Sequence, residues 1–216
     1  MLIFIVFLLD GCIHSKPVIV PETPCSKREH INSASITIID PIIIYESRGM
    51  DSEEVENLSH SILEDVADKA SRNGFSIHTE ADFNPQQRRK IEEIKSTLQN
   101  SRSLFKTRRR CNDVIMHLNS LNTNETFILI ALQMKQTKAN TQDILGRAGA
   151  FDKISSNLVV AAVDVRANEV SWIREAFFRS TPSGFFLGFL WDEGRLSSEL
   201  SDALELVLSS FPTRQE

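Results

Sequence analysis

Residues 127–132, FILIAL, constrain the fold of this 216-residue chain more than any other segment. A strand with six successive apolar residues is apolar on both of its faces, which is the pattern of an interior strand. A second strongly apolar run, residues 158–165, predicts another strand of the same kind. We therefore expect a sheet with helices packed on at least one face.

Shorter patterns predict two further strands. Residues 36–39 and 42–45 are rich in β-branched side chains and indicate a central strand. A break is expected at Asp40-Pro41, because proline cannot donate a hydrogen bond within a ladder. Residues 75–79 alternate between apolar and polar side chains and predict a second strand.

Residues 158–180 are expected to form a hairpin, because the turn between its strands contains Asn168, which tolerates a positive φ. Trp172 lies in the second strand of this hairpin. We expect its side chain to be buried against the last helix, near Leu204 or Leu208.

Three helices are predicted from capping and stop signals. The first begins at Asp51 and closes at Gly74, the second follows Pro85, and the third is capped by Ser197 and stopped by Pro212. The predicted buried side of the first helix is Val55, Leu58, Ile62, Val66 and Ala70. That of the second helix is Ile91, Ile94, Leu98, Phe105, Ile115 and Leu118. That of the third helix is Leu200, Leu204, Val207, Leu208 and Phe211.

The predicted fold class is α/β (α+β), with a mixed sheet in the order β-α-β-α-β-β-β-α and helices packed on it. The second helix is long and is predicted to break around residues 107–112. Residues 136–153 are polar, contain two glycines and predict a long loop. A chain of this length can bury a core without metal or disulfide support.

The amino terminus resembles an export signal. Residues 2–9, LIFIVFLL, are too few to span a bilayer but match the apolar segment of a secretory signal. The following Leu9-Asp10-Gly11-Cys12 resembles the lipobox of bacterial lipoproteins. That resemblance implies lipid attachment at Cys12 and cleavage before it, with palmitate among the acyl chains. The alternative is a buried amino-terminal strand that only mimics a signal.

These features predict three parts of the chain: a signal peptide at 1–11, a lipidated proline-rich tether at 12–33 and one α/β domain at 34–216. The tether is expected to stay extended and to hold the domain off the bilayer. The residue after Cys12 is Ile13 rather than an acidic one, and by resemblance to proteobacterial sorting this implies the outer membrane, with the domain facing the periplasm.

The element order and two local motifs resemble a group of small bacterial envelope lipoproteins. The motifs are residues 42–80, with Gly74-Phe75 opening a strand, and 163–172, VDVRANEVSW. The group shares the fold of the TolB amino-terminal domain and includes the curli-secretion and penicillin-binding-protein activator lipoproteins. The resemblance implies a protein that binds other envelope proteins or assembles into rings, without shared catalytic residues.

Cys25 and Cys111 are the other two cysteines. Their spacing matches no zinc or redox motif. An oxidising compartment would permit a disulfide between them. The spacing alone favours a buried free thiol at Cys111, and both alternatives stay open.

Charge is unevenly distributed, although the whole chain carries a formal charge of only -5. Residues 46–68 hold eight acidic residues and one basic residue, and residues 88–110 hold nine basic and two acidic residues. The candidate basic ridge comprises Arg88, Arg89, Lys90, Arg102, Lys106, Arg108, Arg109 and Arg110. Its functional interpretation is docking to an acidic partner, anionic lipid or peptidoglycan. The favoured interpretation is two solvated helix faces that partly neutralise each other as neighbours.

A second candidate surface is the apolar segment 185–191, FFLGFLW, which turns bracket on both sides. Its large side chains are Phe185, Phe186, Leu187, Phe189, Leu190 and Trp191. The segment is either an exposed contact for a partner or membrane, or an edge strand folded into the core. If it is exposed, Phe186, Phe189 and Trp191 are the expected anchors.

No catalytic, metal-binding or cofactor-binding motif is found, and the five histidines lie far apart in the sequence. Asp164 and Asp192 are expected to serve turns rather than paired-carboxylate chemistry. We therefore expect a non-catalytic, lipid-anchored protein with an envelope protein partner or a second copy as its ligand. It is expected to contact membrane through the lipid only and not to bind nucleic acid. The alternative is a soluble cytosolic α/β enzyme or binding domain with no cleaved signal.

Overall fold

The computed structural model describes residues 16–20, 25, 30–45, 52–99, 108–121, 123, 125–142, 148–180 and 193–214. Its strands are β1 (Val18–Ile19), β2 (Ser35–Ile38), β3 (Ile42–Tyr45), β4 (Ser76–Thr79), β5 (Thr126–Gln142), β6 (Ala148–Asp164) and β7 (Glu169–Ser180). Its helices are α1 (Ser52–Arg72), a short 3-10 helix η2 (Glu80–Asp82), α2 (Pro85–Gln99), α3 (Arg108–Asn119) and α4 (Glu193–Leu208). Among these described helices, none is both long enough and apolar enough to cross a membrane.

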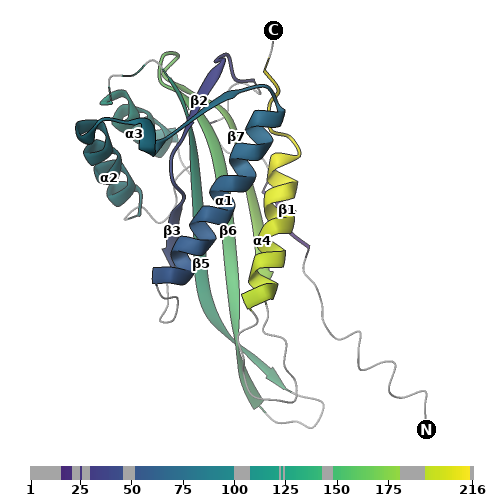
Figure 1. Ribbon diagram of the computed structural model, residues 1–216. Coiled ribbons are helices and arrows are strands. Elements are labelled where there is room, and N and C mark those ends of the chain that lie inside the picture. The colour runs from purple at the N-terminus through teal and green to yellow at the C-terminus, as the bar shows by residue number, and fades with distance from the viewer. Residues whose placement is uncertain are drawn as a thin grey trace.

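All seven strands form one mixed sheet, as Figure 1 shows. The strand order is β1-β7-β6-β5-β2-β4, and β3 pairs with β5 beside β2. β2, β3 and β4 form the parallel part of the sheet, whereas β5, β6, β7 and β1 pair antiparallel. The α/β class and the mixed sheet with packed helices are therefore confirmed.

The predicted break at Asp40-Pro41 divides the first predicted strand into two. β2 lies between β4 and β5, with Thr37 opposite Phe127, and β3 rejoins β5 further along, with Ile43 opposite Leu132. Both pieces stay beside the same interior strand, because the break interrupts the ladder without reversing the chain.

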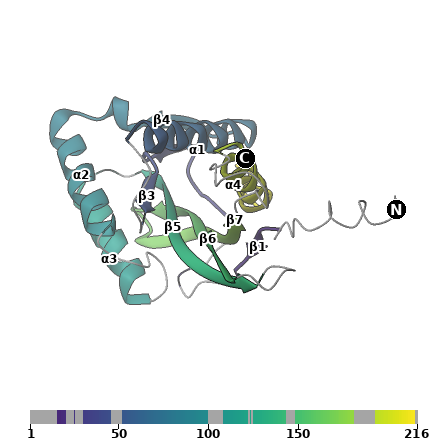
Figure 2. The same cartoon turned by 90° about the horizontal axis from the view of Figure 1, so that it is seen from below.

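Helices cover both faces of the sheet, in two separate layers (Figure 2). Side chains of β5 alternate between them: Ile128 and Ile130 contribute to the core under α1 and α4, whereas Phe127 and Leu129 contribute to the core under α2 and α3. This two-sided burial is the reason that β5 is apolar at every position of its central part.

Two residues have a positive φ at positions where the sequence predicts a helix end or a turn. Gly74, with φ of 90°, follows α1, and the amide of Phe75 donates to the carbonyl of Ala70. Asn168 has φ of 55° in the turn between β6 and β7. The hairpin and the end of the first helix therefore form as predicted.

Residues 136–153 contradict the predicted long loop. β5 continues to Gln142 and β6 begins at Ala148, and the two strands keep one register throughout, from Thr126 opposite Asp164 to Gln142 opposite Ala148. This ribbon extends beyond the helices that cover the sheet (Figure 1). Because these residues have neither the apolar run nor the alternation of a buried strand, periodicity gave no signal there.

Helix boundaries differ from the prediction in two places. The predicted second helix is divided between α2, which ends at Gln99, and α3, which begins at Arg108, whereas the break was expected around residues 107–112; Phe105 lies outside the described residues. α4 begins at Glu193, four residues before the expected cap at Ser197. Its predicted buried side is confirmed, since Leu200, Leu204, Val207, Leu208 and Phe211 are all buried.

The amino-terminal segment contributes to the domain at three points. Val18 and Ile19 pair with Phe177 and Ala176 of β7, and Ile31 is buried in the core under α1 and α4. Cys25 forms a disulfide with Cys111 of α3, with a Cα–Cα distance of 6.0 Å. The favoured free thiol at Cys111 was therefore wrong, because the fold brings together two cysteines that are 86 residues apart.

Trp172 is buried as predicted, with 1% of its surface exposed. It belongs to the same core as Leu204 and Leu208 of α4. Its ring meets that of Phe211 edge to face, with 5.1 Å between the centroids. The hairpin and the last helix are thus joined through this side chain.

Candidate functional site

Part of the predicted site lies outside the described residues. This applies to Cys12, to Arg102 and Lys106 of the basic ridge, and to the whole apolar segment 185–191. Arg108, Arg109 and Arg110 form the first turn of α3, where only the backbone is described. Arg88, Arg89 and Lys90 lie in the first half of α2.

The described ridge residues have local contacts. Arg88 donates from Nε to the Phe83 carbonyl at 2.9 Å and from Nη2 to the Ala81 carbonyl at 2.7 Å. Lys90 Nζ donates to the carbonyl of Ser120 at 2.5 Å, and Arg89 Nε lies 3.9 Å from Glu93 Oε1. Arg88 and Lys90 therefore hold the loops before α2 and after α3.

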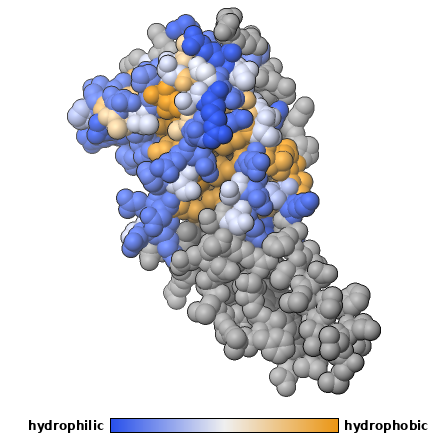
Figure 3. Space-filling view, turned by 45° about the vertical axis from the view of Figure 1, so that its right-hand side comes forward, coloured by the Kyte–Doolittle hydropathy of each residue, from blue (hydrophilic) through white to orange (hydrophobic). Residues whose placement is uncertain are grey.

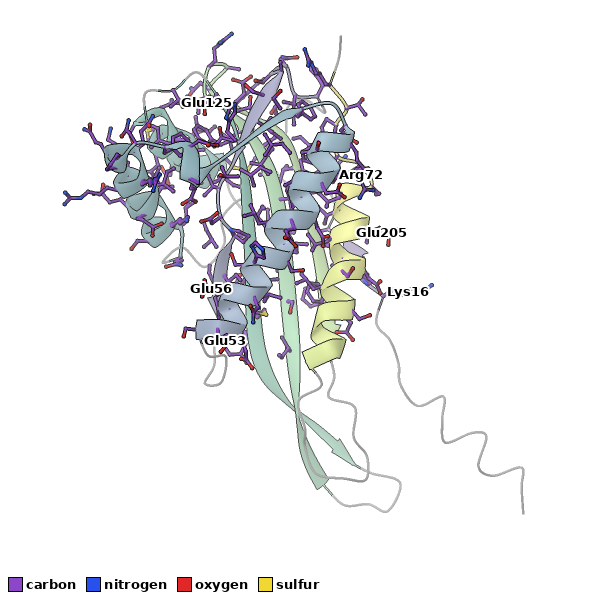
Figure 4. All side chains as sticks on the ribbon, in the orientation of Figure 1. Lys16, Glu53, Glu56, Arg72, Glu125 and Glu205 are labelled. Atoms are coloured by element: carbon purple, nitrogen blue, oxygen red, sulfur yellow. A yellow bond between two sulfur atoms is a disulfide. The ribbon has the colours of Figure 1, made fainter. Side chains whose placement is uncertain are left out.

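The opposite helical layer is acidic. The exposed acidic residues of α1 and α4 are Glu53, Glu56, Glu64, Asp65, Asp68, Asp202 and Glu205; three of them are labelled in Figure 4. Figure 3 shows hydrophilic and apolar side chains side by side over the described part of this surface. Arg72 pairs with Asp68, and His60 Nε2 lies 3.2 Å from Glu64.

The sheet separates the two charged helices. α1 packs on one face of the sheet and α2 on the other. The favoured interpretation, in which these helix faces neutralise each other as neighbours, was therefore wrong. The physical reason is connectivity: η2 and the loop after β4 carry the chain around the sheet edge before α2 begins.

A compact ionic cluster was missed in the sequence. Lys95 of α2 lies 2.7 Å from Glu80 Oε1, 3.2 Å from Glu92 Oε1 and 3.6 Å from Asp40 Oδ2. The amide of Asp40 also donates to Glu80 Oε1 at 2.8 Å. Asp40 follows β2 and Glu80 follows β4, so the cluster lies at the carboxyl ends of two adjacent parallel strands. Two acids after neighbouring parallel strands were the signal that could have revealed it.

Burial and charge act in opposite directions in this cluster. Burial lowers the pKa of Lys95, but the hydrogen bond and the charge of Glu80, with Asp40 and Glu92, outweigh it, so the pKa of Lys95 is raised. Burial raises the pKa of Glu80 more than the contact with Lys95 lowers it. The raised pKa of Lys95 is the shift that decides the charge of the cluster at neutral pH, because three carboxylates lie within 4 Å of its ammonium group. The cluster thus holds Asp40, in the break after β2, against Lys95 of α2.

Other predicted polar residues have structural roles. Asp164 Oδ1 accepts the amide of Ala167 at 2.9 Å and so caps the hairpin turn, as expected; Asp192 lies outside the described residues. His78 Nδ1 lies 3.7 Å from Asp82. Across the described part of the chain, no group of three histidine, cysteine or acidic side chains is arranged to hold a metal ion.

Comparison with known proteins gives similarity to solved structures only. No family model and no curated protein matches the chain. A neuraminyllactose-binding hemagglutinin homolog from Helicobacter pylori is 10% identical over 87% of this chain and 89% of its own, with a TM-score of 0.45.

Two further structures are similar in outline. Lipoprotein GNA1162 from Neisseria meningitidis is 15% identical over 79% of this chain and 96% of its own, with a TM-score of 0.30. The LpoB C-terminal domain from Salmonella enterica is 13% identical over 69% and 86%, with a TM-score of 0.31. The similar structures thus include a lipoprotein, the class that the amino terminus resembles. At these scores and identities they carry no argument about activity.

Proposed function

We propose that this protein is a non-catalytic lipoprotein, anchored through Cys12 to the outer membrane, that faces the periplasm and binds or assembles with other cell-envelope components. The observation that carries the proposal is the Cys25–Cys111 disulfide. Structural disulfides persist in oxidising compartments such as the bacterial periplasm and are rare in the cytosol. The disulfide thus supports export independently of the signal-like segment 2–9 and the lipobox-like Leu9-Asp10-Gly11-Cys12.

Two surfaces are proposed for the protein partner. One is the apolar segment 185–191, with Phe186, Phe189 and Trp191 as anchors, because aromatic side chains dominate interface energetics. The other is the basic ridge around Arg89, whose layer is separated by the sheet from the acidic layer of α1 and α4. A molecule with opposite charges on opposite layers suits partners with a charged surface, including a second copy of itself.

Metabolic labelling with palmitate tests the anchor. We expect the wild-type chain to incorporate label and to sediment with membranes, and Cys12→Ala to lose both properties. Cys111→Ser is the matched control, because it removes a different cysteine and should keep the label. Equal absence of label from the wild type and from Cys12→Ala, with both chains soluble, would refute the proposal and favour the cytosolic alternative.

A further inference from the structure

A row of cations crosses three strands near the end of β7. Lys135 of β5 is opposite Ser155 of β6, which in turn is opposite Arg179 of β7. Residues opposite each other in a ladder lie on the same face of the sheet. Lys135 continues the alternation of Phe127 and Leu129, so this row faces the side that α2 and α3 cover further along the sheet.

The neighbouring row is apolar and open to solvent. Val18 of β1 is opposite Phe177 of β7, one step from Arg179 on the same face. Val18 is 62% exposed, and the Arg179 guanidinium lies 5.1 Å from the centre of the Phe177 ring. Lys16, two residues before Val18, is exposed and labelled in Figure 4. We call Lys16, Val18, Lys135, Phe177 and Arg179 the anchor patch.

Glu175, an acidic residue two positions before Phe177, has a buried side chain. Glu175 is on the same face as Phe177 and is 8% exposed. Asn157 Nδ2 donates to its Oε1 at 2.6 Å. Lys135 and Arg179 are exposed beside the apolar side chains of Val18 and Phe177, a combination typical of groups that meet lipid headgroups.

Chain length places the patch near any lipid on Cys12. Only four peptide steps separate Cys12 from Lys16, which is a reach of at most about 14 Å. β1 enters the sheet antiparallel to β7, so the chain arrives from the end at which β7 finishes. A bilayer holding the Cys12 lipid must therefore lie within that short distance of the patch.

We propose that the anchor patch rests on anionic phospholipid headgroups of the membrane that holds the Cys12 lipid. This inference rests on the proposed lipid anchor and adds an orientation and a second contact to it. The α1 and α4 layer does not suit this role, because its exposed acidic residues, such as Asp202 and Glu205, would be repelled by the same headgroups.

The orientation can be measured with a bimane label at Val18→Cys or at Met116→Cys in the mature lipidated chain. These positions are a matched pair, because Val18 and Met116 are both 62% exposed. Met116 lies on α3, three residues before Asn119, which donates to Asn168 in the turn at the other end of β7. Vesicles of phosphatidylcholine, with or without phosphatidylglycerol, would carry a nitroxide headgroup quencher.

We expect the label at position 18 to be quenched more strongly than the label at position 116, and more in the anionic vesicles. Lys135→Glu and Arg179→Glu should each reduce the preference for anionic vesicles by at least about fivefold, the effect of losing one positive charge. Arg166→Glu, in the hairpin turn, is the control and should have no effect. Stronger quenching at position 116, or no response to lipid charge at position 18, would overturn the inference.

The mass of the same protein shows, independently of quenching, whether Cys12 carries a lipid. If Cys12 carries no lipid, the proposed function fails, and flotation of the unlipidated chain with anionic vesicles still tests the patch. Binding that Arg179→Glu weakens would uphold the headgroup contact, and absence of binding would overturn it.

Discussion

Lys95 is the residue whose surroundings most clearly link charge to stability. Its side chain is 13% exposed and lies against Glu80, whose side chain is 12% exposed. The pKa of Lys95 is raised above its ordinary value of 10.5, so its contribution to folding is fully present below pH 10.5 and is lost as the pH rises through the folded-state pKa.

Lys95→Met should therefore lower the free energy of unfolding by about 1–3 kcal/mol at neutral pH, because it removes the charged donor from the buried Glu80 carboxylate. The difference from the wild type should shrink once the pH exceeds the folded-state pKa of Lys95, which lies above 10.5, because the side chain loses its proton there. Urea unfolding at both pH values measures this. Lys90→Met on the same helix is the control, because Lys90 donates to the backbone carbonyl of Ser120. A deficit independent of pH would mean that packing, not charge, sets the effect.

Trp172 is the largest fully buried side chain of the described core. Trp172→Ala should lower the free energy of unfolding by about 3–5 kcal/mol, because the surrounding side chains cannot fill the cavity. Trp172→Phe should cost less: it keeps a ring beside Phe211, and the indole Nε1 has no hydrogen-bond partner among the described residues. Thermal unfolding of the three proteins compares them, and an unchanged Tm in Trp172→Ala would contradict the packing described here.

At the scale of elements, the disulfide joins the amino-terminal segment to α3. Cys25 and Cys111 are both buried among residues of α2, α3 and the sheet. The long segment between them would otherwise be free in the unfolded chain, so the bond restricts mainly the unfolded state.

Cys25→Ser/Cys111→Ser should lower the free energy of unfolding by about 2–4 kcal/mol. Dithiothreitol should destabilise the wild type by a similar amount and leave the double variant unchanged. Thiol titration of the denatured mature protein, without and with reductant, counts the cysteines involved. Two titratable thiols before reduction would show that the bond is not formed.

At the scale of the whole molecule, the sheet separates acidic helices from basic ones and carries the anchor patch near the edge where the chain enters. We propose different ligands for these surfaces: protein partners for the helical layers, and lipid headgroups for the anchor patch. With a lipid on Cys12, this arrangement would hold one end of β7 towards the bilayer and leave both helical layers accessible.

The class of fold and most of its elements could be predicted from the amino-acid sequence alone. The interior strand containing 127–132, the hairpin with Asn168, and the closure of α1 at Gly74 all follow from local rules of burial and backbone conformation. Their signals lie within a few residues, which is the range over which periodicity and turn preferences act.

The contacts between distant residues could not be predicted in this way and were found in the folded chain. The Cys25–Cys111 bond, the Lys95 cluster and the row of Lys135 and Arg179 each join segments far apart in the chain. The extended ribbon of β5 and β6 belongs to the same class, because it depends on pairing between the two strands. Register and layer order arise from contacts across the whole sheet, so no local pattern reports them.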